Sequence, residues 1–451
     1  MDMGDLFVSV RGRVLINVEA LNMTESVGNY VKHRRVPVIS PKTYATYFVP
    51  AVSGESVAHG YQRVLAEKTK NKDGLKDKLC DLCKQGIFLK SANNSVICGA
   101  FGSKLKSWKI NSEADFEKAI ISNCVVEDVG GFLYAPGRQE KLSEGDEEML
   151  EQAGIRDNKG KNKFENIKRT SSFSIGYMIP ANEAIENIII EPQLHSRYAL
   201  GTPFVERGAQ GQMIYYVELS SAPYVFSFDL DTKYIGKLTF YYENVGDLAV
   251  DENERKKRIN LSLESLRDLL IEMMFGAKKA RFLPVIDWES IVIALSNNTW
   301  TVPSPLTVDY IMSALNKQNR INNGTELFVY INPALFENTT SYVRKRTEEL
   351  LKSFYESLEE FKKKLEERGD DSLLDWGEFK KRKLEEFLEK KVDELVESSD
   401  LRYVSAIQRK YKEVKEKLRE GKEKIHVYEN FEECISGMLD SSKERMEKTE
   451  G

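Results

Sequence analysis

Histidine and cysteine are scarce in this chain of 451 residues. The four histidines are His33, His59, His195 and His426. The five cysteines are Cys80, Cys83, Cys98, Cys124 and Cys434. So few histidines limit the histidine-based catalysis and metal binding that the chain can support. Because we expect no secretory leader, an odd number of cysteines argues against a disulfide scaffold.

Long apolar runs and common enzyme motifs are also absent. No run reaches about 18 apolar residues, and no basic segment followed by an apolar one begins the sequence. We therefore expect a soluble, cytoplasmic protein with no membrane partner. The sequence has no P-loop, GxSxG or HExxH, and no GxGxxG that opens a strand–turn–helix unit. We expect that the protein is not an enzyme and has no cofactor.

The charge is nearly balanced, with 66 basic and 71 acidic residues and a formal net charge of −5. This balance does not exclude a nucleic-acid partner, because salt screens charges beyond about 8–10 Å and a partner responds to local fields. Residues 341–451 hold 26 Lys or Arg and 29 Asp or Glu. Their apolar residues recur at helical spacing, which predicts a charged helical extension, a hairpin with its hinge near 368–371.

The rest of the chain alternates between strand and helix patterns. Residues 7–19 place valines and Ile16 on one face and polar residues on the other, which predicts a half-buried strand. A helix is predicted after an N-cap at Ser53, and a second over 254–275 with Gly276 at its end. Within an irregular, partly mobile insertion, "VVEDVGGFLYAPG" predicts a strand that breaks at paired glycines.

The order of strand, helix, strand, strand, helix and strand is ferredoxin-like, so we expect an α+β fold. It is shared by RNA-recognition domains. The expected parts are a palm at 1–70 and 173–300 with a hairpin thumb at about 193–220, an inserted finger region at 71–172, the end of the core at 301–340 and the helical extension at 341–451.

Two basic segments are candidate phosphate-binding sites. Lys32, His33, Arg34 and Arg35 follow Asn29 and stand next to an apolar Val-Pro-Val. An extended chain would put Lys32 and Arg34 on one face and the other two opposite. The second segment, "FGAKKARFLP" at 275–284, carries Lys278, Lys279 and Arg281. The alternatives are a solvated loop for the first and capping of a helix C-terminus for the second.

The predicted thumb supplies a further candidate pair. His195 and Arg197 have the same strand parity and should project together, which suits base stacking or phosphate contact. A structural histidine is the alternative. The tip at 201–211, with Phe204 and Val205, is either an exposed wedge or an ordinary turn.

The cysteines offer a possible zinc site. Cys80 and Cys83 form one CxxC pair, and Cys98 and Cys124 would complete four thiolates. The second pair lacks the usual close spacing, so small buried hydrophobic residues are the favoured interpretation and no metal is expected.

Six motifs resemble one known family. They are "VRGRVLINVEALNMTESVGNYVKHRRVPV", "YFVPAVSGESVAHGYQ", "DVGGFLYA", "RTSSFSIGYMIPA", "YVELSSAPYVFSFDLD" and "GAKKARFLP", in order from residue 11 to 284. They look like the DevR-type CRISPR-associated backbone subunit of the Cas-seven family, in its archaeal subtype I-A form.

The resemblance implies an RNA-recognition-type palm whose copies stack as a helical filament on CRISPR RNA. In such a Cascade complex the subunit contacts other Cascade subunits and presents the guide to target DNA, without cutting nucleic acid, in antiviral defence. The RNA-facing residues implied are Asn29, Lys32, His33, Arg34, Ser53, His195 and the "GAKKAR" loop. Phosphate contacts would accept any guide sequence.

Three other functions stay open. A metal-independent ribonuclease would use His33 or His195 as general base, although the sequence shows no clear second group. A DevR-like transcriptional autoregulator would bind duplex DNA, although no helix-turn-helix is evident. Residues 341–451 would make the chain chiefly an interaction protein.

Overall fold

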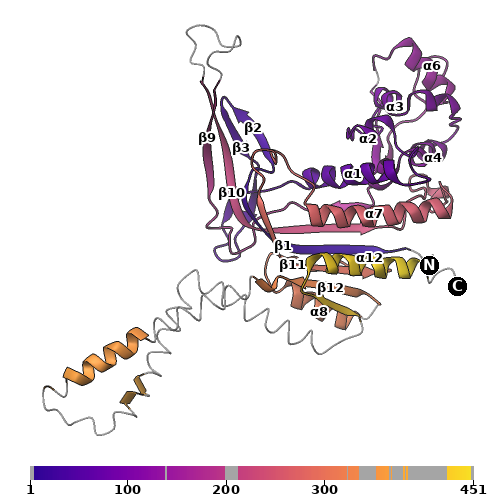
Figure 1. Cartoon of the computed structure of the whole chain (residues 1–451). Coiled ribbons are helices and arrows are strands. Elements are labelled where there is room, and N and C mark those ends of the chain that lie inside the picture. Colours follow the sequence, from indigo (N-terminus) through magenta and orange to yellow (C-terminus); the bar gives the residue numbers. More distant parts are fainter. Residues whose placement is uncertain are drawn as a thin grey trace. The chain divides into compact units, whose positions relative to one another are not determined.

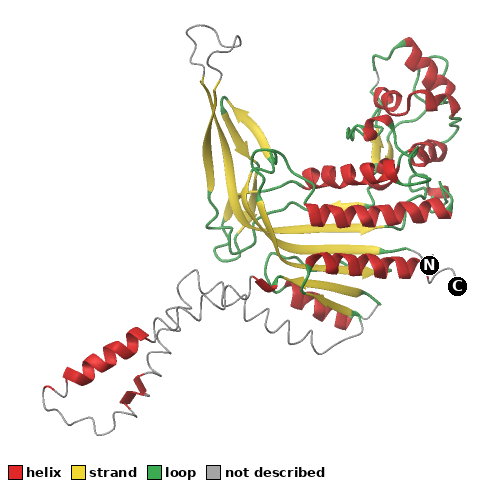
Figure 2. Cartoon of the chain, in the orientation of Figure 1, coloured by secondary structure: helices red, strands yellow, loops and turns green. Residues whose placement is uncertain are grey.

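A nine-stranded mixed sheet is the largest sheet in the part of the chain that the structure describes (Figures 1 and 2). This computed structural model describes residues 5–137, 140–198, 212–321, 324–334, 352–364, 367, 379–380, 382–383 and 424–447. The chain divides into a body, Met1–Tyr330 with Lys424–Gly451, and a second unit, Ile331–Glu423. None of the described helices has the length and hydropathy of a membrane span.

Groups of consecutive strands and groups of consecutive helices follow one another along the body. The strands of the main sheet are β1 (Phe7–Glu19), β2 (Met23–Val27), β3 (Tyr30–His33), β8 (Phe173–Ile175), β9 (Ile190–Tyr198), β10 (Gln212–Asp231), β11 (Val285–Ser296), β12 (Glu326–Ile331) and β13 (Ile425–Tyr428). Two small sheets pair β4 (Arg35–Ile39) with β5 (Thr46–Pro50) and β6 (Phe132–Tyr134) with β7 (Ile167–Arg169). The helices are α1 (Gly54–Asn71), α2 (Asp81–Lys84), α3 (Asn94–Phe101), α4 (Glu113–Asn123), α5 (Val125–Gly130), α6 (Glu144–Gln152), α7 (Glu252–Glu272), α8 (Tyr310–Arg320) and α12 (Phe431–Glu447), with short 3-10 turns η1 (Gly102–Ser107) and η2 (Tyr242–Asn244).

The central strand β1 lies between β10 and β11 and is antiparallel to both. As predicted, Val8, Val10, Val14 and Ile16 are fully buried. Val18 was expected on the same buried face, and this is wrong, because Val18 is 50% exposed and has a φ of 57°. The opposite face of β1 is also covered, because Arg13 is fully buried and its Nε donates to Glu289 Oε1 at 2.9 Å.

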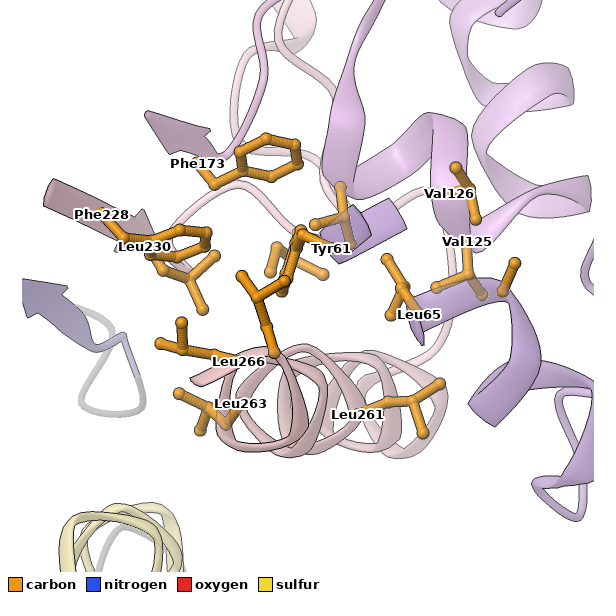
Figure 3. Packing of buried hydrophobic residues seen from close by; sticks show 14 of the residues in the cluster. Tyr61, Leu65, Val125, Val126, Phe173, Phe228, Leu230, Leu261, Leu263 and Leu266 are labelled. Atoms are coloured by element: carbon orange, nitrogen blue, oxygen red, sulfur yellow. The ribbon is translucent and has the colours of Figure 1, made fainter. Parts of the chain in front are cut away.

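The helices α1 and α7 pack side by side against one face of the sheet (Figure 1). Ser53 caps α1 as predicted, because its hydroxyl accepts from the Ser56 backbone N–H at 3.2 Å. Figure 3 shows Tyr61 of α1 among leucines of α7 and Phe228 of β10. The Tyr61 ring meets Phe173 edge-on at 4.8 Å and Phe228 at 5.1 Å, so aromatic packing joins helix and sheet.

The end of α7 differs from the expectation. The helix ends at Glu272, and Met273 takes the left-handed conformation with a φ of 46°, so Gly276 is not the residue that ends it. Gly276 has a φ of +91°, and a Cβ there would lie 2.5 Å from Leu21 Cδ2. Glycine is therefore required because the loop after α7 presses against the end of β1.

The inserted region 71–172 is more regular than expected, because it is largely helical and packs into the same core. The strand predicted in "VVEDVGGFLYAPG" is wrong for its first half, since Val125–Gly130 forms α5 and only Phe132–Tyr134 is a strand. Gly131, with a φ of +66°, separates the two. The helical conformation places the Asp128 carboxylate between Arg169 of β7 and Arg258 of α7, which both bind it.

A buried ion network fastens this region to the body. Asp128 binds Arg169 Nη2 through Oδ1 at 2.5 Å and Arg258 Nη1 through Oδ2 at 2.7 Å, and Gly236 N–H donates to Oδ1 at 3.1 Å. Arg169 Nη1 also binds Glu117 Oε1 at 2.7 Å. Both Asp128 and Glu117 are fully buried, so these partners replace the water that each carboxylate loses.

The expected helical extension at 341–451 is wrong for its end, which includes a strand of the main sheet. Ile425–Tyr428 pairs with β12 in parallel, with Leu327 opposite Ile425. Phe431 of α12 stacks on Trp288 of β11 at 5.1 Å between ring centroids. The apolar faces of β12 and α12 therefore complete the core. The helical spacing of apolar residues in the sequence does not predict this packing.

In the second unit, residues 352–364 are helical, as the sequence predicts. Phe361 stacks with Phe379 at 6.1 Å, and Lys380 Nζ lies 4.8 Å from the centroid of the Tyr355 ring. These contacts return the chain toward the helix, as a hairpin requires. The predicted hinge at 368–371 and most of the predicted helices lie outside the described residues.

Phe431→Ala should lower the free energy of unfolding of the body by about 3–5 kcal/mol, because a buried aromatic ring leaves a cavity. Urea unfolding measures the change. The matched control is Phe48→Ala, at a side chain that is 69% exposed, where the change should stay within about 0.5 kcal/mol. Equal effects of the two variants would contradict the placement of α12 in the core.

Asp128→Asn should cost about 3–5 kcal/mol, because it breaks two buried ion pairs and leaves Arg169 with only Glu117, and Arg258 with only Glu254, as a countercharge. The midpoint and slope of urea unfolding report the loss. Asp73→Asn is the control for the same change at the surface, where the ion pair with Lys76 has an Asp side chain that is 95% exposed, and the midpoint should not move. An unchanged midpoint for Asp128→Asn would show that the network is dispensable.

Candidate nucleic-acid interface

A three-residue connection after β1, residues 20–22, holds together segments that lie far apart in the sequence. Leu21 O accepts from Ala277 N–H at 2.7 Å, which fixes the loop after α7. Asn22 O accepts from Arg34 N–H at 2.8 Å, and Asn22 Oδ1 accepts from Ser53 N–H at 3.0 Å. Both basic segments selected from the sequence are therefore anchored to adjacent residues.

Glu19 forms a buried polar cluster directly before this connection. Its Oε1 accepts from Ser220 Oγ at 2.5 Å and from Tyr224 O–H at 2.8 Å, and it lies 2.5 Å from His33 Nε2. Burial opposes the charged forms of both Glu19 and His33, but the hydrogen bond and the opposite charge outweigh it. The pKa of Glu19 is therefore lowered and the pKa of His33 is raised.

The basic run is divided between the interior and the surface. His33 is only 2% exposed, so its imidazole joins the core instead of the surface. Lys32 and Arg34 are half-buried, and Arg34 Nε is buried without a hydrogen-bond partner in the described part of the chain. Arg35 is exposed, and its Nη2 donates to Glu218 Oε1 at 2.7 Å. Three of the four cations are thus accessible at least in part.

The hairpin of β2 and β3 is fastened along β10. Asn29 Nδ2 donates to Ile214 O at 3.1 Å, and Asn29 O accepts from Tyr216 N–H at 2.8 Å. The Tyr30 ring stacks on Tyr216 with centroids 5.9 Å apart, and its hydroxyl donates to Glu218 Oε1 at 3.0 Å. These contacts fix the direction of the strand that carries Lys32.

A second cluster lies around His195, on the face of β10 opposite to Tyr216 and Glu218, because successive side chains of a strand alternate. His195 of β9 stands opposite Tyr215 and stacks on it at 5.3 Å, as the predicted hairpin of β9 and β10 places them. Phe282 meets the imidazole edge-on at 5.1 Å, and Arg281 Nη1 donates to Tyr215 O–H at 2.6 Å. The loop after α7 therefore meets the predicted thumb.

His195 is half-buried, and its Nε2 is buried without a hydrogen-bond partner among the described residues. Arg197 stands two residues further along β9, opposite Met213, so the two have the strand parity predicted for them. The predicted tip at 201–211 lies outside the described residues.

The remaining loop cations differ in their surroundings. Lys279 Nζ donates to Met273 O at 2.7 Å, just past the end of α7, which is the capping contact of the alternative interpretation. Burial lowers the pKa of Lys279, and the charge of Glu272 opposes this shift. Lys278 is half-buried with a φ of 55°, and Arg281 is exposed.

Apart from Arg197, the predicted residues fall into three groups, and RNA contact stays a prediction for all of them. His33 and Ser53 are buried and hold the backbone in place, and Lys279 caps a helix. The surface or half-buried residues are Asn29, Lys32, Arg34, His195, Lys278 and Arg281. Tyr215 and Phe282, which surround His195, were missed, although the hairpin register predicts Tyr215 next to His195.

The cysteines divide differently from the four-thiolate set. Cys80, Cys83 and Cys124 come together with Glu127. Cys98 does not join them, and its Sγ lies 3.9 Å from Asp146 O. The four-thiolate set, which was the less favoured interpretation of the sequence, is therefore wrong for Cys98.

Comparisons with known proteins agree with the sequence motifs. The model of the family described as CRISPR-associated negative auto-regulator DevR/Csa2 matches residues 10–314. The CRISPR-associated protein Cas7/Csa2 1 of Saccharolobus solfataricus is 32% identical over 313 residues, which is 68% of this chain and 85% of the relative. The aCascade subunit Cas7/Csa2 2 of the same organism is 31% identical over 326 residues, 71% of this chain and 89% of the relative. A chain of a solved CRISPR RNA-guided surveillance complex covers 72% of this chain and 91% of its own length at 8% identity and a TM-score of 0.36.

His33→Gln should destabilise the protein in a pH-dependent manner. Because the folded pKa of His33 is raised, its stabilisation is fully present below the unfolded value of about 6.5 and is lost as pH rises through the folded pKa. Because the folded pKa of Glu19 is lowered, its stabilisation is present above about 4.5 and is lost as pH falls through the folded pKa.

The difference in free energy of unfolding between wild type and His33→Gln should therefore be largest between pH 4.5 and 6.5 and should shrink at higher pH. Urea unfolding across this range measures it, with His59→Gln at a position outside this cluster as the control. A difference that stays constant with pH would show that the His33–Glu19 ion pair does not form.

Proposed function

Because the chain belongs to the CRISPR-associated DevR/Csa2 family of Cas7 proteins, we propose that it binds CRISPR RNA as a backbone subunit of a type I-A Cascade complex. Copies of the chain would assemble along the RNA, contact other Cascade subunits and present the guide for pairing with target DNA. The relative named as an aCascade subunit supports assembly into such a complex.

The observation that carries the proposal is the attachment of two basic segments to one short connection. Leu21 anchors the loop that contains Lys278 and Arg281, and Asn22 anchors Arg34. A backbone subunit needs several cations at fixed positions, because each phosphate along the bound strand carries a negative charge. Phosphate contacts carry no sequence information, so this arrangement suits a protein that must accept any guide.

Aromatic side chains give the proposed RNA path a second kind of contact. His195, Tyr215 and Phe282 form a cluster beside Arg281. Aromatic rings stack on bases of any identity, which again favours binding without sequence preference. We assign His195, which is half-buried, to RNA contact through the accessible part of its ring.

The strand order supports a ferredoxin-like palm as the scaffold of this site. Strands β11, β1, β10 and β8 lie in that order and are antiparallel wherever their registers are given, and α1 follows β1 while α7 follows β10. This is the connectivity of the ferredoxin-like fold with a large insertion after α1. The region 71–172 is then the finger, and β9 with the first part of β10 is the thumb.

We also propose that the protein does not cut RNA. Of the two histidines that a ribonuclease would use, His33 is buried against Glu19. General acid–base catalysis needs a second group within hydrogen-bond reach of the substrate. The ring neighbours of His195 are Tyr215 and Phe282. These surroundings favour a binding role over catalysis.

A salt titration separates RNA contact from helix capping in the loop after α7. On single strands, the slope of log affinity against log salt has a magnitude of about 0.7 for each phosphate that the protein neutralises. We expect Lys278→Ala with Arg281→Ala to reduce this magnitude by up to about 1.4 on two RNAs of unrelated sequence. Lys279→Ala is the matched control, which should lower thermal stability and leave the slope unchanged because Lys279 caps α7.

Other results would overturn the proposal in distinguishable ways. An unchanged slope in the double variant would remove this loop from the RNA path. A change with only one RNA would mean that the loop reads bases. Cleaved RNA after incubation would favour the ribonuclease, and tighter binding of duplex DNA than of RNA would favour the autoregulator named in the family description.

A further inference from the structure

Four potential metal ligands from two separate parts of the inserted region converge in the core. Cys80 stands at the N-cap of α2 and Cys83 lies in that helix, while Cys124 stands at the N-cap of α5 and Glu127 lies within it. Their ligand atoms, three Sγ and one carboxylate oxygen, all lie within 4.8 Å of one another. None of the four residues is more than 2% exposed.

The surroundings of the Glu127 carboxylate indicate that this cluster lacks a bound ligand. Both of its carboxylate oxygens are buried without a hydrogen-bond partner in the described part of the chain. The other buried carboxylates nearby are satisfied, since Asp128 binds two arginines and Glu117 binds Arg169 and backbone N–H groups. A buried carboxylate whose oxygens accept no hydrogen bond is unfavourable in its charged form, so the site calls for a cation in direct contact with it.

We propose that Cys80, Cys83, Cys124 and Glu127 bind a structural zinc ion. Thiolates select soft and borderline metals, and three sulfur ligands with one oxygen can form the tetrahedral shell that zinc prefers. Four protein ligands in a buried position leave no open coordination site, so the ion would be structural.

The local backbone is arranged for a metal-bound thiolate. The Cys83 backbone N–H donates to Cys80 Sγ at 3.4 Å, across the CxxC spacing. The ammonium group of Lys90 lies beside the cluster. Its Nζ donates to Gly130 O at 2.9 Å, and its charge interacts with the charges of Glu127 and Cys83. A cation at this position partly offsets the negative charge that three thiolates and a carboxylate retain around a divalent ion.

The ion would join α2 to α5 across the 40 residues between Cys83 and Cys124. Val125 N–H already donates to Lys78 O at 2.9 Å at the same junction. Glu127 directly precedes Asp128, so the ion would also fix the helical turn that presents Asp128 to its arginines. This role is independent of RNA binding.

The test is the metal content of the full-length chain, expressed with added zinc and purified under reducing conditions. We expect about one zinc ion per chain. Cys124→Ser should lose the metal, and Glu127→Gln should lower zinc affinity by at least about 10-fold, the loss typical even for an outer partner of a metal ligand. Cys98→Ser is the matched control, a buried cysteine outside the cluster, and should keep its zinc.

A second measurement covers variants that fail to fold. Cobalt added to chelator-treated wild-type protein should give the thiolate-to-metal charge-transfer bands of a tetrahedral site, and zinc should displace them and raise the melting temperature. Wild-type protein with less than about 0.1 zinc per chain and no cobalt bands would overturn the proposal. If Cys98→Ser lost its zinc while Cys124→Ser kept it, the proposed set of four ligands would be wrong. A disulfide within the cluster, detected as fewer than five free thiols in the chelated, denatured protein, would show redox chemistry instead.

Discussion

The rest of the body depends on one interaction, the pair of buried salt bridges that Asp128 forms with Arg169 and Arg258. Arg169 comes from β7, at the end of the inserted region, and Arg258 from α7, which covers the central sheet. Each charge was removed from water on folding, and the low dielectric of the interior makes their mutual attraction strong and their separation costly. The arrangement of about a hundred inserted residues is thereby coupled to the helix layer.

This coupling explains why the inserted region shares the core of the body. Apolar side chains of α3, α4 and α5 belong to the same hydrophobic cluster as those of α1 and α7. Hydrophobic contact alone fixes such a region only loosely, because it is non-directional. The buried ion pairs add direction, since each guanidinium accepts its carboxylate in only a few geometries. Glu117 strengthens the same junction through Thr239 and Phe240.

The elements predicted correctly from the sequence are those with local patterns. The strand β1 with its buried valines, the cap of α1 at Ser53, most of α7 and the hairpin of β9 with β10 all depend on residues close in the chain, whereas the polar face expected for β1 is buried too. The pairing of Leu327 with Ile425 has no local signal, so the return of the chain to the sheet was missed. The helix α5 was missed because its buried Asp128 is stabilised by arginines that are distant in the sequence.

The candidate site was predictable by segment but not by side chain. The sequence shows that Lys32, His33 and Arg34 are adjacent, but only Glu19, brought beside β3 by the sheet, decides that the imidazole lies inside. In the same way, the sequence offered Cys98 only as a further cysteine without the usual spacing, whereas the first turn of α5 brings Glu127 to the other thiols. Which member of a cluster is buried depends on partners that are remote in the sequence.

The parallel pairing of β12 with β13 has a consequence for the chain between them. Adjacent parallel strands need a crossover of only about a dozen residues, and the second unit, Ile331–Glu423, far exceeds this length. The entropy cost of closing a loop grows slowly, by about 0.6 kcal/mol for each doubling of its length. The sheet therefore sets a minimum span for this connection but almost no maximum. The connection is a permissive insertion point, at which related chains can gain, lose or exchange a whole module while the sheet keeps its register.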